Sequence, residues 1–134
     1  MAERRESGVL DTCAYIDLGQ LDPAVLPEVP ELTAITMAEL HQGVALAKDA
    51  AARVARTGKL GAAIVEFEPL PFDGQAAARF GTLVALTSET NRDPKPRRPD
   101  LMIAAIASAP RLPLYTRNTK DFAGLEGMVE IIEV

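Results

Sequence analysis

Short apolar runs alternate with helix-forming segments along this chain, and this alternation constrains the fold more than any other feature. The pattern predicts strands at 7–11, 32–35, 112–116 and 128–133, with 65–70 as a strand or an extended connector. It predicts helices at 12–21, 36–47, 49–57, 59–64, 74–90 and 101–108, and a proline-rich loop at 91–99. Apolar strands that alternate with helices indicate an α/β domain with a mainly parallel sheet.

The length of 134 residues predicts a single domain over residues 1–134, which can bury a core without disulfides or structural metals. No apolar run approaches the roughly 20 residues that cross a bilayer, so we expect no membrane association. The charged N-terminal segment lacks an apolar stretch and is not expected to be a secretory signal. The single cysteine, Cys13, suits the reducing cytoplasm and is expected in the core.

The residue types restrict the kind of metal site that the chain can build. One cysteine and one histidine disfavour a zinc site, because such sites draw on clusters of these residues. Any metal must therefore be held by oxygen. The net charge of −5 argues against a nucleic-acid partner, but seven of the 14 lysines and arginines lie between Arg92 and Lys120. This basic segment is either a solvated surface or a place for phosphate.

Four acidic residues lie where the expected elements begin or end: Asp11, Glu39, Asp100 and Asp121. Each has a structural explanation, because aspartate is a favoured N-cap and Glu39 follows Thr36 at the spacing of a capping box. Asp11, Glu39 and Asp121 nevertheless follow strands, so we expect them at the edge where parallel strands end and ligands bind. Asp100 joins them if its helix is suitably placed. Crowded carboxylates favour a divalent cation, and oxygen ligands favour Mg²⁺ or Mn²⁺.

Four segments in order resemble the PIN-domain family, and within it the VapC toxins of toxin–antitoxin pairs. They are VLDTC at 9–13, ITMAELHQG at 35–43, RPDLMIAAIA at 98–107 and YTRNTKDF at 115–122. The resemblance implies a PIN-like α/β/α sandwich that acts as a Mg²⁺- or Mn²⁺-dependent endoribonuclease. It also implies a VapB-type antitoxin as partner and a homodimer. The alanine-rich helices between Val44 and Ile64 are expected to leave grooves for an amphipathic helix of that antitoxin.

The resemblance implies that Asp11, Glu39 and Asp100 are metal ligands, with either Asn118 or Asp121 at the fourth position. The supporting residues that we expect around them are Thr12, Thr116 and Asn118, which would hold the carboxylates or waters of the metal. The residues that we expect to contact RNA are Arg97, Arg98 and Arg117. Pro99 is expected to keep Arg98 extended.

Two other functions remain open from the residues themselves. The chain could be a phosphoacceptor or phosphatase domain with Asp11 as nucleophile, but position 13 is cysteine where an Asp-x-Asp pattern is expected. It could also be a PIN-like binding module without catalytic activity. The complete set of Asp11, Glu39 and Asp100 favours the nuclease over this module.

Overall fold

The computed structural model describes residues 4–134, so the first three residues of the segment considered above as a signal lie outside the described residues. Its centre is a sheet of four parallel strands in the order β2-β1-β3-β4. The strands are β1 (Ser7–Leu10), β2 (Val29–Glu31), β3 (Leu114–Thr116) and β4 (Ile131–Glu133). The predicted α/β class with a mainly parallel sheet is confirmed.

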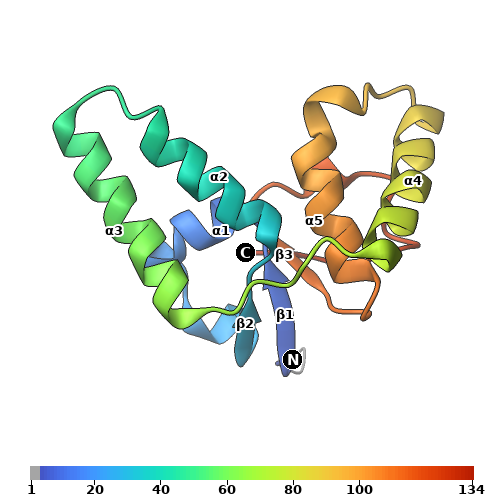
Figure 1. The fold of residues 1–134 in the computed structure, drawn as a ribbon. Coiled ribbons are helices and arrows are strands. Elements are labelled where there is room, and N and C mark those ends of the chain that lie inside the picture. Colours follow the sequence, from blue (N-terminus) through green and yellow to red (C-terminus); the bar gives the residue numbers. More distant parts are fainter. Residues whose placement is uncertain (1–3) are drawn as a thin grey trace.

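Five α-helices connect and cover these strands within residues 4–134: α1 (Thr12–Ile16), α2 (Ala34–Ala45), α3 (Ala50–Glu66), α4 (Gly74–Glu89) and α5 (Arg98–Ser108). Short 3₁₀ helices lie at η1 (Leu18–Gln20), η2 (Pro23–Val25), η3 (Lys95–Arg97) and η4 (Thr119–Phe122). The helices α2 and α3 form one arm of the molecule, and α4 and α5 form the other (Figure 1). In the described part of the chain, every helix is too short or too polar to span a bilayer.

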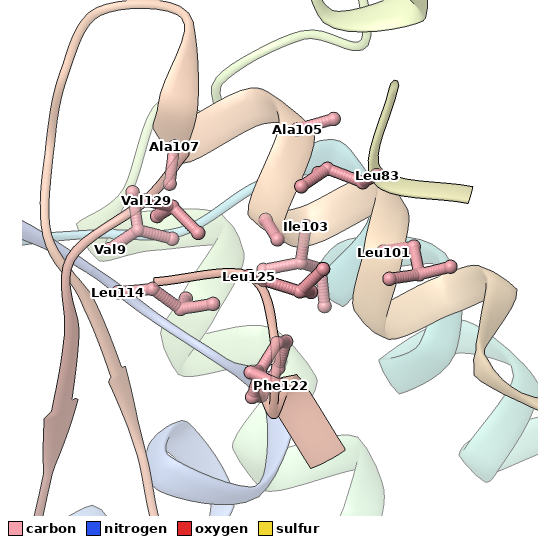
Figure 2. Close-up of a cluster of buried hydrophobic side chains, with 11 residues drawn as sticks. Val9, Leu83, Leu101, Ile103, Ala105, Ala107, Leu114, Phe122, Leu125 and Val129 are labelled. Carbon is pink, nitrogen blue, oxygen red and sulfur yellow. The ribbon is translucent and has the colours of Figure 1, made fainter. Parts of the chain in front are cut away.

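Successive residues of the central strands supply two separate cores, because side chains in a strand point alternately to opposite faces of the sheet. Val9 and Leu114 belong to a cluster with α4 and α5, whose members converge on α5 in Figure 2. Leu10 and Tyr115 belong to the other cluster, with α1, α2 and α3. The helices therefore lie on both faces of the sheet, as the expected three-layer sandwich requires.

Side-chain caps fix where most of the helices begin. The carboxylates of Asp11, Asp49 and Asp73 accept hydrogen bonds of 2.7–2.9 Å from backbone N–H groups three residues later, at the starts of α1, α3 and α4. The hydroxyl of Thr33 accepts the N–H of Thr36 at 3.1 Å and starts α2. Each cap satisfies a donor that the helix itself leaves unpaired. The expected cap at Asp73 is confirmed.

The second strand lies earlier than the sequence pattern predicts, and this prediction was wrong. The strand β2 covers Val29–Glu31, whereas the expected segment 32–35 contains the cap Thr33 and the first turn of α2. Pro30 obscured the strand, since a proline weakens a strand pattern but is tolerated at the edge of a sheet, where β2 lies. Because α2 starts at Ala34, the capping box of Thr36 and Glu39 does not form.

Several other expected boundaries differ from those in the structure. The helix expected at 12–21 ends at Ile16 and continues as η1, while the two helices expected at 49–57 and 59–64 are one helix, α3. Of the connector at 65–70, the first two residues are helical and only Leu70 forms a bridge, to Thr33. The strands β3 and β4 are each shorter than predicted.

The basic loop is more ordered than the sequence predicts. It contains η3, and α5 already begins at Arg98, which has helical angles of φ −52° and ψ −48°. The expectation that Pro99 keeps Arg98 extended was wrong. Pro99 occupies the first turn of α5, where a missing N–H costs no hydrogen bond.

Candidate active site

Asp11 lies directly after β1, at the edge of the sheet where its parallel strands end. Its carboxylate is only 5% exposed and caps α1 through a 2.8 Å bond from the Ala14 N–H. The side chain of Thr116, the last residue of the neighbouring strand β3, lies beside this carboxylate and favours its charged form, which acts to lower its pKa. Asp11 is thus both a helix cap and a fixed acidic group.

Glu39 and Asp100 reach the same region from two helices. Glu39 lies in α2, half-buried, and its Oε1 accepts a 2.7 Å hydrogen bond from the hydroxyl of Thr12. Asp100 lies in the first turn of α5 and is also half-buried. The placement expected for Asp100, at the start of its helix, is confirmed.

Asp121 completes the group from η4, after the strand β3. Its Oδ1 lies 3.5 Å from the guanidinium of Arg97, which lies in the proline-rich loop. Asn118 is exposed, and its backbone N–H donates to the Thr116 hydroxyl at 3.0 Å. Asn118 therefore contacts the site through its backbone and Asp121 through its carboxylate.

Asp11 and Asp100 lie close enough to the other acidic side chains of the site for the pKa values of these two carboxyl groups to be raised. Burial is the main cause that raises the pKa of Asp100 to about 6, followed by the negative charges of the other three carboxylates. Burial also raises the pKa of Asp11, and the negative charges of Asp121 and Glu39 raise it further. The Thr116 side chain and the hydrogen bond from the Ala14 N–H act in the opposite direction and offset part of this rise. The arginine at position 97 partly offsets this crowding at Asp100. The edge of the sheet thus carries concentrated and incompletely compensated negative charge.

The chemistry of these donors fits a hard divalent cation, since all of them are carboxylate oxygens that repel one another. In the part of the chain that the structure describes, no three histidine, cysteine, aspartate or glutamate side chains are arranged to hold one ion together. Binding would therefore require these side chains to turn towards a common point. Cation binding is the step that would relieve their repulsion.

The three arginines expected to contact RNA have different surroundings. Arg98 is exposed at the start of α5. Arg97 pairs with Asp121, and Arg117 pairs with Asp17 at 3.2 Å. Asp17, at the end of α1, is a site neighbour that sequence analysis missed, because nothing in its local pattern distinguishes it from a surface acid. Arg98 is therefore the arginine among these three that is most available to phosphate.

The Thr12 hydroxyl donates to Glu39 and the Thr116 side chain lies beside the Asp11 carboxylate, and the supporting role of both residues stays a prediction. Thr36 was missed, because its position three residues before Glu39 favoured a capping role. It is fully buried, and its hydroxyl lies 3.0 Å from that of Thr12. Cys13 is exposed rather than buried in the core, so that expectation was wrong.

A cleft of about 640 Å³ opens beside the site, between α2 and α3. Its lining includes Thr12 and Glu39 of the site, and Arg56 and Lys59 of α3. A second cleft shares Ala55 and Lys59 with the first and continues along α3. Leu46 and Val54, at 66% and 73% exposed, leave apolar surface beside these clefts. The grooves expected between 44 and 64 are therefore present.

The chain is similar over nearly its whole length to known proteins. The chain is 38% identical over 139 aligned residues to ribonuclease VapC5 of Mycobacterium tuberculosis (strain ATCC 25618 / H37Rv), with 100% of both chains covered. It resembles the solved structure of VapBC-5, a member of the VapBC family of toxin–antitoxin systems from the same species. That match has a TM-score of 0.85 and 39% identity over 96% of this chain and 99% of that chain.

A second solved structure supports the same comparison at lower identity. FitAcB from Neisseria gonorrhoeae matches with a TM-score of 0.70 and 27% identity, over 93% of this chain and 96% of that one. No family model matches the chain. These relatives each align with nearly the whole length of the chain.

Proposed function

The chain belongs to the VapC ribonucleases of VapBC toxin–antitoxin systems, and we propose that it cleaves RNA phosphodiester bonds with the help of Mg²⁺ or Mn²⁺. The observation that carries this proposal is that four carboxylates lie near one another at one edge of the sheet. Such a cation, when bound, supplies a more acidic water and neutralises charge on the phosphate.

Some residues of the chain would bind the cation, and others would orient the carboxylates that bind it. Asp11, Glu39 and Asp100 would hold the cation, and Asp121 would join them by giving up its pairing with Arg97. Thr12 and Thr116 keep two of these carboxylates in fixed orientations through their hydroxyl groups. Directed carboxylates matter because a misplacement of about 1 Å costs a large part of catalysis.

The surface beside the carboxylates would orient the RNA backbone. Arg98 is free of an ion pair within residues 4–134 and lies at the start of the helix that carries Asp100. Guanidinium groups pair with phosphate oxygens in two parallel hydrogen bonds. We place this activity in the cytoplasm, where the RNA substrate is present.

An antitoxin of the VapB type is the partner that fits the clefts between α2 and α3. An amphipathic helix of the antitoxin could lay apolar anchors against Leu46 and Val54, with acidic residues towards Arg56 and Lys59. Glu39 lines the first cleft, so an arginine of an antitoxin bound there would be within reach of this carboxylate. Such an arginine would compete with the cation and hold the nuclease inactive.

Chelation tests the proposed chemistry. The purified chain should cleave a single-stranded RNA in Mg²⁺ or Mn²⁺, lose this activity in excess EDTA and regain it when the cation is restored. The cleaved substrate is separated on a denaturing gel, with the heat-denatured protein as a control for contaminating nuclease. Full cleavage in excess EDTA would overturn the metal-dependent mechanism.

A further inference from the structure

The carboxylate of Glu39 is held by a hydrogen bond that joins two helices. The hydroxyl of Thr12, in α1, donates to Glu39 Oε1, in α2, at 2.7 Å. Thr12 directly follows Asp11, the residue that caps α1. The orientation of Glu39 relative to Asp11 therefore depends on how firmly the Thr12 hydroxyl is held.

A second hydroxyl lies behind Thr12. Thr36 Oγ1 is 3.0 Å from Thr12 Oγ1, and Thr36 is 0% exposed. A hydroxyl carries one proton, and an ionised carboxylate can only accept. Because the proton of Thr12 is used on Glu39, the bond between the two hydroxyls must be donated by Thr36. The direction of the chain is thus fixed: Thr36 donates to Thr12, and Thr12 donates to Glu39.

This use of the Thr36 hydroxyl differs from the usual one in a helix. A threonine inside a helix commonly donates to a backbone carbonyl one turn earlier, as Thr87 does to the Leu83 oxygen at 2.9 Å. In the described part of the chain, Thr36 is instead directed at Thr12. A bond received from Thr36 polarises Thr12 and makes it a stronger donor.

We propose that Thr36 is a positioning residue, which acts through Thr12 to orient the Glu39 carboxylate for binding of the divalent cation. This inference rests on the proposed function, since it assigns Glu39 to the cation site. Thr36 touches neither the substrate nor the cation. Its effect should therefore appear in Mn²⁺ affinity and in kcat, with the KM for RNA nearly unchanged.

Substitutions that separate the hydroxyl from the side-chain volume test the proposal. Thr36→Val removes the hydroxyl and keeps the shape, Thr36→Ser keeps the hydroxyl, and Thr87→Val removes a buried hydroxyl from α4 as a matched control. Mn²⁺ affinity is measured by electron paramagnetic resonance. We expect Thr36→Val to weaken binding by about 3- to 10-fold, below the 10- to 100-fold typical of a direct partner of a metal ligand. Thr36→Ser and Thr87→Val should bind like wild type.

A double substitution tests whether Thr36 acts through Thr12. Thr12→Val removes the last link to Glu39, so adding Thr36→Val should weaken Mn²⁺ binding no further. Additive losses, or wild-type affinity in Thr36→Val, would overturn the proposal. If Thr36→Val does not fold, Thr36→Cys replaces it against Thr36→Ser, because the two side chains are similar in size and a thiol is a weak donor.

The same titration separates this proposal from the proposed function. If wild type binds no Mn²⁺, the cation site itself is refuted, and the role of Thr36 with it. If wild type binds Mn²⁺ and cleaves RNA while Thr36→Val does both equally well, only the role of Thr36 is refuted.

Discussion

Asp100 couples the charge of the site to the stability of the metal-free fold. Burial, with the neighbouring carboxylates, raises its pKa from 3.8 to about 6. The folded state therefore binds this proton more tightly than the unfolded chain does, so the free energy of unfolding should fall as the pH rises through this interval. We expect the thermal midpoint in EDTA to decrease from about pH 4 to about pH 6, and Asp100→Asn to flatten the decrease. A difference between the two proteins that does not vary with pH would contradict this.

Removing charge from single carboxylates separates ligands from helix caps. Asp11→Asn and Asp100→Asn keep the size of the side chain and a capping oxygen but remove a charge that the cation requires. RNA cleavage should fall by at least ~100-fold in each variant. The matched control is Asp73→Asn, which changes the cap of α4 in the same way. Folded stability in EDTA should hold or rise, and full activity in Asp11→Asn and Asp100→Asn would mean that both residues are only caps.

The sequence predicted which acidic residues lie near one another, but not which ion pairs they and their neighbours form. The acidic side chains expected at the site lie near one another, and three of them, Asp11, Asp100 and Asp121, lie just after a strand or near the start of a helix, whereas Glu39 lies in the middle of α2. The pairings of Arg97 with Asp121 and of Arg117 with Asp17 were not predictable. Each partner in these pairs reaches the site from a distant segment, and local patterns carry no information on such approaches.

The prediction on RNA binding concerns Arg98, at the start of α5. Arg98 is exposed at the start of α5, whereas Arg111 is exposed just beyond its other end. Replacing Arg98 by glutamine should reduce the salt dependence of RNA binding by a slope of about 0.7 for one lost single-strand phosphate contact. Arg111→Gln should leave the slope unchanged. Binding is measured by fluorescence anisotropy in EDTA at several salt concentrations.

Two outcomes would argue against a phosphate contact at Arg98. An unchanged slope in Arg98→Gln means that the start of α5 is only solvated surface. Equal changes in Arg98→Gln and Arg111→Gln indicate a general effect of net charge. Substitution of Arg97 is less informative, because it also removes the ion pair with Asp121.

The elements show where local sequence patterns fail. The edge strand β2 contains Pro30, and α5 begins before Pro99, so proline was overweighted as a breaker in both places. In each case the missing N–H lies where no hydrogen bond is required, at a sheet edge or in a first helical turn. The strongly apolar α5 was predicted well, because seven of its residues are buried in the core beside the sheet.

The architecture of the whole molecule follows from the alternation of strands and helices more securely than any boundary does. The PIN-like sandwich expected from four sequence segments agrees with the likeness to VapBC-5 at a TM-score of 0.85. Parallel strands place all their carboxyl ends at one edge, so this topology alone brings Asp11 and the end of β3 together. The expected homodimer stays a prediction, as does the single domain over residues 1–134.

A ribonuclease that is not held inactive should harm the cell that makes it. We expect expression of the chain alone to slow growth. Co-expression with the small gene directly upstream, where we expect the antitoxin to be encoded, should restore growth. Asp100→Asn should be harmless at the same expression level, which controls for the burden of expression. The measurement is growth rate, with the complex isolated by affinity purification. Harmless expression of wild type without any bound neighbouring product would refute the toxin role and leave the nuclease chemistry to be tested separately.

The central claim is that the carboxylates at the edge of the sheet bind a divalent cation, and direct titration tests it. Mn²⁺ is added to the purified chain, and the free ion is measured by electron paramagnetic resonance for wild type, Asp100→Asn and Asp73→Asn. We expect wild type and Asp73→Asn to bind with equal affinity and Asp100→Asn to lose binding by at least ~10-fold. Equal binding by all three proteins, or no binding by wild type, would contradict the account.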